Sequence, residues 1–255
     1  VAIFDFDNTC IFRDIGQATF RFQIEHLRYR LTPEELATIL PQGERELAGR
    51  PLAIIRSTLV QSYGELWPLI ASGQQEQAKQ QPAYAFFATL LLWCTDMARK
   101  DERFGPRYVL PFMGKMLAGF TTEEVRQMAR EVVVQTGTEP LSTERFSAEA
   151  PPPIGAIEAS SPTGLHPYLE MRGLMEQLAK AGIGRYVISA SAEWLVEGAA
   201  PLLGFPIDNA HIFGIRVRLD ASASGSPEAV PVLGKSGLLK TLVQSQGLVR
   251  IPAGL

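Results

Sequence analysis

The sequence predicts an α/β fold in which a parallel sheet is interrupted by a long helical insertion. Two apolar stretches, residues 1–4 and 186–191, have the composition of buried strands. After residue 167 helical and strand patterns alternate, which implies a parallel sheet with right-handed crossovers. Residues 11–139, by contrast, carry apolar side chains at helical spacing and contain no convincing strand.

The insertion is predicted to consist of amphipathic helices. Capping boxes at residues 32–35 and 121–124 mark two helix starts, because each pairs a threonine with a glutamate three residues later. The predicted helices cover residues 17–28, 33–40, 52–63, 82–97 and 122–134. Residues 139–163 are rich in proline, glycine and serine, and we expect an irregular return path there. The elements predicted after it are helix 167–181, strand 186–191, helix 193–203, strand 212–219 and helix 236–246.

Composition limits the partners of the chain. The 255 residues are 46% hydrophobic and 20% charged, with a net charge of −3, so there is no electrostatic footprint for nucleic acid. The longest apolar run, residues 84–94, is too short for a membrane span of about 20 residues. Two cysteines make no disulfide framework. Cys10 is interpreted as a small, semi-buried residue rather than a reactive one.

Asp5 and Asp7 directly follow the first strand. Residues two apart share a face of a strand, so both carboxylates are predicted to point the same way. Two carboxylates held together repel each other, and burial raises their pKa values. A bound cation relieves this, or one carboxylate acts as nucleophile while the other shuttles a proton. The alternative is a polar turn with two solvated acids.

Ser189 and Lys235 are the other candidate site residues. Ser189 ends the second strand, where open α/β sheets bind ligands, and its hydroxyl could join the N–H groups of the next helix in a phosphate cradle. A helix cap is the alternative for Ser189. Lys235 is predicted to lie at a helix start, either as a phosphate-binding cation or as a surface lysine. A P-loop is excluded, because Ala229 stands where its first glycine is required.

These motifs resemble those of the haloacid dehalogenase-like (HAD) phosphatase superfamily. Residues 5–9, Asp-Phe-Asp-Asn-Thr, resemble its first motif, residues 187–191 its second and Lys235 its third. The helical block between the first two motifs is similar to the cap of the phosphoserine phosphatase-like and phosphorylcholine phosphatase-like branch. The resemblance implies a Rossmann-like parallel-sheet core of residues 1–12 and 165–255, with an all-helical cap of residues 13–164.

The resemblance also implies an activity, a cofactor and site residues. The activity is a Mg²⁺-dependent phosphomonoester hydrolase that acts on a small phosphorylated metabolite through an aspartyl phosphate. Asp5 is the expected nucleophile and Asp7 the general acid–base, and both are expected to hold Mg²⁺, Asp7 through its backbone carbonyl. The residues expected to bind the substrate are Thr9, Ser189, Ala190 and Lys235.

One departure from the family pattern concerns the metal site. The fourth motif, an acidic cluster that completes the Mg²⁺ site, has no counterpart, because no aspartate or glutamate follows Lys235. We therefore expect either that the gene continues past Leu255 with a further strand and acidic residues, or that the protein is a degenerate member with a binding or scaffold role. A phosphotransferase would share every site residue, whereas a dehalogenase would have no use for Asp7.

The sequence says less about the binding partner and the cellular compartment than about the fold. A small-molecule phosphomonoester is the predicted partner, with no nucleic acid and no membrane span, and the oligomeric state stays open. The chain begins at Val1 without a methionine, so we expect a segment to precede it. Both a cytoplasmic and an exported location remain compatible with the sequence.

Overall fold

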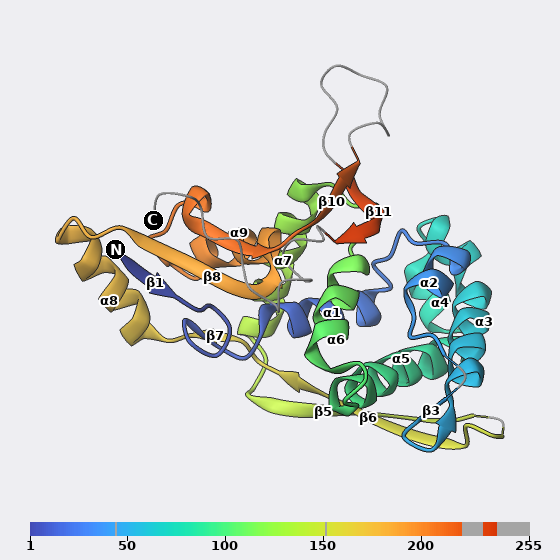
Figure 1. The fold of residues 1–255 in the computed structure, drawn as a ribbon. Coiled ribbons are helices and arrows are strands. Elements are labelled where there is room, and N and C mark those ends of the chain that lie inside the picture. Colours follow the sequence, from blue (N-terminus) through green and yellow to red (C-terminus); the bar gives the residue numbers. More distant parts are fainter. Residues whose placement is uncertain (44, 151, 221–231, 239–255) are drawn as a thin grey trace. The chain divides into compact units, whose positions relative to one another are not determined.

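The computed structural model describes residues 1–220 and 232–238 apart from residues 44 and 151, with side chains as far as Val217 (Figure 1). Packing divides the chain into two compact units, which are described separately. Unit 1 contains Val1–Phe20, Met113–Ser142 and Pro162–Leu255, and unit 2 contains Arg21–Phe112 and Thr143–Ser161.

Unit 1 is built on a three-stranded parallel sheet with the strand order β1-β8-β9. The strands are β1 (Ala2–Phe4), β8 (Arg185–Ala192) and β9 (Ile212–Ile215). Ile3 pairs with Tyr186, and Val187 pairs with Ile212. The predicted α/β class and parallel sheet are therefore confirmed.

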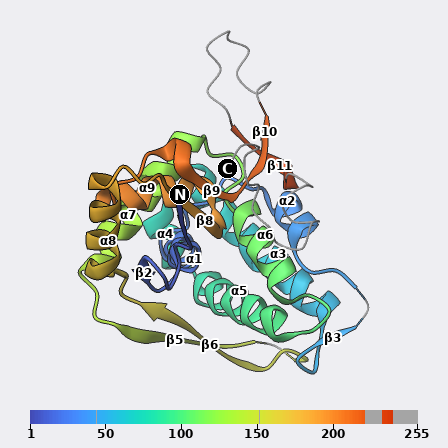
Figure 2. The ribbon, with the colours of Figure 1, turned by 60° about the vertical axis from the view of Figure 1, so that its left-hand side comes forward.

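Helices α7 and α9 pack closely against each other in unit 1 (Figure 2). Gly198 permits this contact, because a Cβ at that position would overlap the main-chain oxygen of Arg126. The compact unit that contains the sheet also contains α7, which lies within the residues 13–164 of the predicted cap. The helices of this unit are α7 (Thr122–Gly137), α8 (Leu169–Lys180), α9 (Glu193–Leu202), the 3₁₀ turn η1 (Asn209–His211) and the start of α1 (Ile15–His26).

Two antiparallel strand pairs also belong to the described part of unit 1. Strand β2 (Ile11–Phe12) pairs with β7 (His166–Pro167), and β10 (Val217–Asp220) pairs with β11 (Val232–Leu238). The prediction of a helix start at Lys235 is wrong, because Lys235 lies within β11. Antiparallel pairing with β10 sets its conformation. The rest of that predicted helix, residues 239–246, lies outside the described residues.

Unit 2 is mainly helical, and both predicted capping boxes of the chain are present, at Thr32 here and at Thr121 in unit 1. Its helices are α2 (Pro33–Ile39), α3 (Leu52–Ala71), α4 (Gln75–Lys79), α5 (Pro82–Lys100) and α6 (Gly105–Lys115), which continues into unit 1. The short strands β3 (Glu46–Leu47) and β4 (Arg50–Pro51) pair with each other. Within the described residues no helix is long and apolar enough to cross a membrane.

The return path contains regular structure that was not predicted. Strands β5 (Ser142–Glu149) and β6 (Ala156–Thr163) pair with each other, where residues 139–163 were expected to be irregular. Most β5 side chains are exposed, so the sequence lacks the apolar alternation that reveals a half-buried strand. Of the prolines that suggested a loop, Pro152 and Pro153 lie in the connection between the two strands, whereas Pro162 lies within β6.

The aromatic residues of unit 2 form part of its core. Tyr63 and Phe87 are 1% and 0% exposed, and their rings stack with centroids 5.2 Å apart. The Tyr63 hydroxyl donates a 2.6 Å hydrogen bond to the Leu31 carbonyl. These rings stabilise helix packing in the described structure.

Candidate active site

The candidate site lies where β1 and β8 end. Asp5 directly follows β1, and Asp7 lies two residues further on. Ser189 and Ser191 are among the last four residues of strand β8. Because β1 and β8 are parallel neighbours, their carboxyl ends meet at one edge of the sheet. The structure thereby brings Asp7 together with Ser189, 182 positions away in the sequence.

The Asp7 carboxylate accepts hydrogen bonds at both oxygens. Ser189 Oγ and Ser191 Oγ donate to Oδ2 at 2.9 and 2.8 Å, and the main-chain N–H of Ile15 donates to Oδ1 at 2.8 Å. Ile15 is the first residue of α1, so the carboxylate also faces the positive end of a helix dipole. Groups from β8 and α1 therefore fix its orientation.

Asp7 titrates near neutral pH. Burial raises its pKa to about 7, and the negative charge of Asp14 adds to this increase. The Ile15 N–H and the two serine hydroxyls stabilise the carboxylate and act in the opposite direction. A group with such a pKa can both donate and accept a proton at neutral pH, as general acid–base catalysis requires.

The environment of Asp5 differs from that of Asp7, because Asp5 is exposed to solvent. Its Oδ1 accepts a 2.8 Å hydrogen bond from the Phe6 N–H, and its Oδ2 accepts a long, 3.4 Å bond from the Thr9 hydroxyl. Oδ2 therefore has one long hydrogen bond, on a residue that is exposed to solvent. The two carboxylates that were predicted as a pair thus differ in burial and in hydrogen bonding.

Cys10 lies next to both aspartates. Its Sγ donates to the Asp5 carbonyl at 3.1 Å, and its side chain is fully buried. Burial, followed by the charges of Asp5 and Asp7, raises the pKa of the thiol to about 12. The thiol is therefore protonated at neutral pH, and Cys10 is fully buried rather than semi-buried as the sequence predicted.

Ser189 does not cap helix α9. The N-cap is Ala192, and no side chain makes a cap hydrogen bond there. Instead, Ser189 Oγ accepts a 2.9 Å hydrogen bond from the Ser191 N–H while its own hydroxyl donates to Asp7. Ala190 stands exposed between these two buried serines.

Lys235 is not placed relative to this cluster. Its backbone lies in β11, but side chains are described only as far as Val217. Its contact with a phosphate group therefore stays a prediction.

The fit of the residues to Mg²⁺ rests on two oxygen donors. The exposed carboxylate of Asp5 is suited to a hard cation, and the Asp7 main-chain carbonyl is the second expected ligand. The Asp7 side chain is already engaged at both oxygens. Within residues that the structure describes, no group of three or more His, Cys, Asp or Glu is placed to hold a metal. A Mg²⁺ ion here would take its other ligands from water and substrate, as this ion often does.

Three site residues were missed by sequence reasoning: Ser191, Asp14 and Gly16. Ser191 lies two residues after Ser189, and this spacing, which was used for Asp5 and Asp7, could have identified it. Asp14 caps the start of α1, with its Oδ1 accepting the Gln17 N–H at 2.8 Å, and influences Asp7. A Cβ on Gly16 would lie 3.0 Å from Ser191 Oγ, so glycine lets α1 approach β8 closely. No local sequence pattern predicts that approach.

A family model and a solved structure are similar to this chain. The model of the MoeA C-terminal region (domain IV) matches residues 214–255. The structure, described as a conserved functionally unknown protein from Anaerococcus prevotii, superposes with a TM-score of 0.75 at 20% sequence identity. The match covers 91% of this chain and 64% of that one, and at this identity it shows the fold alone. No curated protein matches the chain.

Lys235 lies within the family match, which begins at Gly214. This part of the chain is therefore similar to a different family from the one that residues 5–9 resemble. The cluster of Asp5, Asp7, Ser189 and Ser191 lies entirely outside the matched residues.

Proposed function

We propose that this chain is a Mg²⁺-dependent phosphomonoester hydrolase that acts on a small phosphorylated metabolite through an aspartyl-phosphate intermediate. The observation that carries the proposal is the Asp7 carboxyl group, which has a pKa of about 7 and accepts hydrogen bonds from two serines at the end of a parallel sheet. Asp5, exposed and two residues earlier, supplies a separate carboxylate. A Rossmann-like core with a helical cap belongs to the same proposal.

Asp5 and Asp7 would perform two successive displacements. Asp5 Oδ2 attacks the phosphorus atom while the P–O bond to the alcohol breaks, and protonated Asp7 gives its proton to the leaving oxygen. Asp7, now a carboxylate, then takes a proton from a water molecule that attacks the aspartyl phosphate. This second step releases inorganic phosphate and restores both carboxyl groups to their starting states.

The serines would bind the phosphoryl group. Their hydroxyls converge on one oxygen of Asp7, so a phosphoryl group beside Asp7 lies within their reach. Asp5 and the Asp7 carbonyl would hold Mg²⁺, whose positive charge would offset the repulsion between carboxylate and phosphate. Thr9, Ala190 and Lys235 are proposed as further substrate contacts on the family resemblance.

Replacement of Asp5 by asparagine tests the proposal. Asp5→Asn removes the nucleophile at nearly constant size, so hydrolysis of p-nitrophenyl phosphate with Mg²⁺ is expected to fall by several orders of magnitude with folding intact. Asp208→Asn is the matched control, because Asp208 is an exposed aspartate of the same unit. Turnover of Asp5→Asn at the wild-type rate would refute the mechanism.

A trapping experiment separates hydrolysis from transfer. Acid quenching during turnover is expected to leave a phosphoryl group on the peptide that contains Asp5. A phosphotransferase would form the same intermediate but, with an added alcohol, would yield mainly a phosphorylated acceptor in place of inorganic phosphate. A binding or scaffold protein would yield neither product.

A further inference from the structure

Strand β8 carries a bulge where its two serines face Asp7. Ile188 pairs with Phe213 and Ala192 pairs with Ile215, so three residues of β8, Ser189 to Ser191, stand opposite the single residue Gly214 of β9. A bulge redirects the side chains of the longer strand. Here it accompanies the placement of both serine hydroxyls on Asp7 Oδ2.

Glu193 connects β9 to this bulge through a hydrogen bond. It is the first residue of α9, two positions after Ser191, and is 3% exposed. Its Oε2 accepts a 3.1 Å hydrogen bond from the Gly214 N–H, the amide opposite the bulge. The carboxylate therefore joins the end of β8 to the middle of β9.

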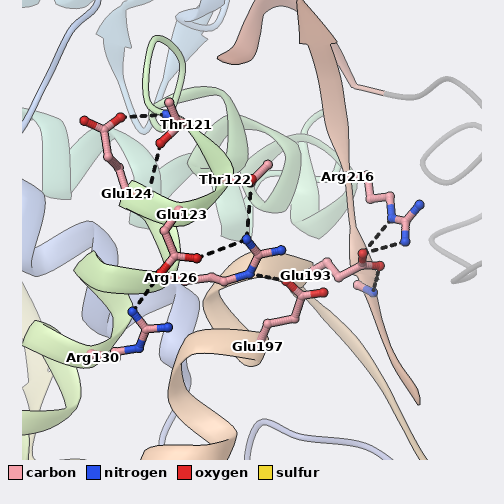
Figure 3. Close-up of polar contacts among 10 residues, drawn as sticks. Thr121, Thr122, Glu123, Glu124, Arg126, Arg130, Glu193, Glu197 and Arg216 are labelled. Atoms are coloured by element: carbon pink, nitrogen blue, oxygen red, sulfur yellow. Dashed lines mark hydrogen bonds and ion pairs between the residues drawn. The ribbon is translucent and has the colours of Figure 1, made fainter. Parts of the chain in front are cut away.

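Arg216 neutralises and orients Glu193. Its Nε donates to Glu193 Oε1 at 2.7 Å, and its Nη2 lies 2.6 Å from the same oxygen (Figure 3). Glu193 thus uses one oxygen for the β9 backbone and the other for a cation. A buried carboxylate requires such partners, because an unpaired charge in the interior is costly.

Gly214 completes the arrangement. A Cβ at this position would lie 2.6 Å from Glu193 Cα and 2.7 Å from the Ser191 carbonyl oxygen. The backbone of β9 therefore contacts the bulge directly, and a displacement of Gly214 would be transmitted to Ser191. Packing and the Glu193 hydrogen bond act at the same place.

We propose that Glu193 is a positioning residue that holds the β8 bulge, and through it the hydroxyls of Ser189 and Ser191, in the orientation that the proposed phosphoryl chemistry requires. Glu193 itself contacts neither Asp5 nor Asp7 in any described hydrogen bond. The catalytic part of this inference rests on the proposed function, whereas its structural part, the fastening of the bulge, does not.

The chain offers a matched control in Glu197. It lies one turn further along α9, is 7% exposed and is paired with an arginine, because Arg126 Nε donates to its Oε2 at 2.7 Å (Figure 3). Both glutamates are therefore buried, ion-paired residues of one helix. Glu193 alone of the two bonds to the strand opposite the bulge.

The structural readout is hydrogen exchange of the Ser191 amide, which donates to Ser189 Oγ. In Glu193→Ala the protection factor of the Ser191 amide is expected to fall by about tenfold or more, which corresponds to the free energy of about one hydrogen bond. Glu193→Gln retains an oxygen acceptor and should restore most of the protection, and Glu197→Gln should leave it unchanged. If Glu193→Ala does not fold, Glu193→Asp, one methylene shorter, takes its place.

The kinetic readout is kcat and KM for p-nitrophenyl phosphate, normalised to folded protein. Glu193→Ala is expected to lower kcat/KM by about 10²-fold, as a displacement of roughly 1 Å at a reacting group does. Glu193→Gln should be intermediate, and Glu197→Gln should stay within about twofold of the wild type.

The outcomes separate the two proposals. Unchanged Ser191 protection in Glu193→Ala, or a loss of activity in Glu197→Gln as large as that in Glu193→Ala, would overturn the positioning role. An inactive wild-type protein in which Glu193→Ala alone loses Ser191 protection would refute the proposed function and leave the fastening of the bulge established.

Discussion

Ser191 Oγ donates a 2.8 Å hydrogen bond to Asp7 Oδ2 across 184 positions of the sequence. The bond connects the end of β8 to the turn after β1, and it shares its acceptor oxygen with Ser189. Hydrogen bonds to a charged group contribute about 1.5–3 kcal/mol, so this contact both stabilises the ionised form of Asp7 and ties two strand ends together.

Loss of the Ser191 hydroxyl is predicted to raise the pKa of Asp7 further. The hydroxyl stabilises the carboxylate, so Ser191→Ala should shift the titration upward from about 7 and lower folding stability by about 1–3 kcal/mol above that pH. The pKa is measured from the carboxyl ¹³C shift of Asp7 in metal-free protein. Ser57→Ala, at an exposed helical serine, is the control. An unchanged Asp7 pKa would contradict the geometry.

Asp7 is also predicted to make folding stability depend on pH. Its pKa rises from 3.8 to about 7 on folding, so the folded state binds more protons between these values. The contribution of Asp7 to folding stability should therefore be greatest below about pH 4. It should fall as the pH rises to about 7 and stay constant at higher pH. Urea unfolding of metal-free protein at several pH values measures this, and Asp7→Asn should abolish that component. Identical pH profiles for both proteins would show that the carboxyl is not buried as described.

Part of this site could be predicted from sequence because it depends on short-range patterns. The apolar strand before Asp5 and the hydroxyls that end β8 follow from local composition, and parallel pairing then places them at one edge of the sheet. The two capping boxes were predictable for the same reason, since their hydrogen bonds span three residues.

The remainder depends on contacts that no local pattern encodes. The bulge opposite Gly214 arises from the register of β8 and β9, and Gly16 matters only because α1 approaches Ser191. Exposed β5 lacks alternation, so its pairing with β6 overrides a proline-rich composition that predicts a loop. Lys235 was misplaced because a short Gly-Lys-Ser-Gly segment between apolar residues fits a strand as well as a helix start.

Gly16 is predicted to be more important for activity than for stability. Gly16→Ala would put a methyl group 3.0 Å from Ser191 Oγ and 3.2 Å from Asp14 Oδ1, so the Ser191 hydroxyl is expected to shift by a few tenths of an ångström from its position beside Asp7. Hydrolysis of p-nitrophenyl phosphate should fall by about tenfold, less than the roughly 10²-fold loss that a 1 Å displacement causes. Gly173→Ala is the control, because a Cβ there meets nothing within 4 Å, and helix propensity should make it neutral or stabilising by up to about 1 kcal/mol. Equal activity of the two variants would exclude the steric role.

The pair of Arg126 and Glu197 is predicted to stabilise the contact between α7 and α9. Arg126→Met leaves Glu197 buried without its 2.7 Å partner, and breaking a buried pair from one side costs about 3–5 kcal/mol. Burial already raises the pKa of Glu197, and Arg126 opposes that shift, so the variant should raise the pKa further. The loss of stability should then shrink as the pH falls and Glu197 becomes protonated. Urea unfolding of Arg126→Met at pH 8 and pH 5 measures this difference, and the double variant Arg126→Met/Glu197→Gln should be more stable than Arg126→Met at pH 8. A loss of the same size at both pH values would mean that the packing of the arginine stem, rather than its charge, holds the helices together.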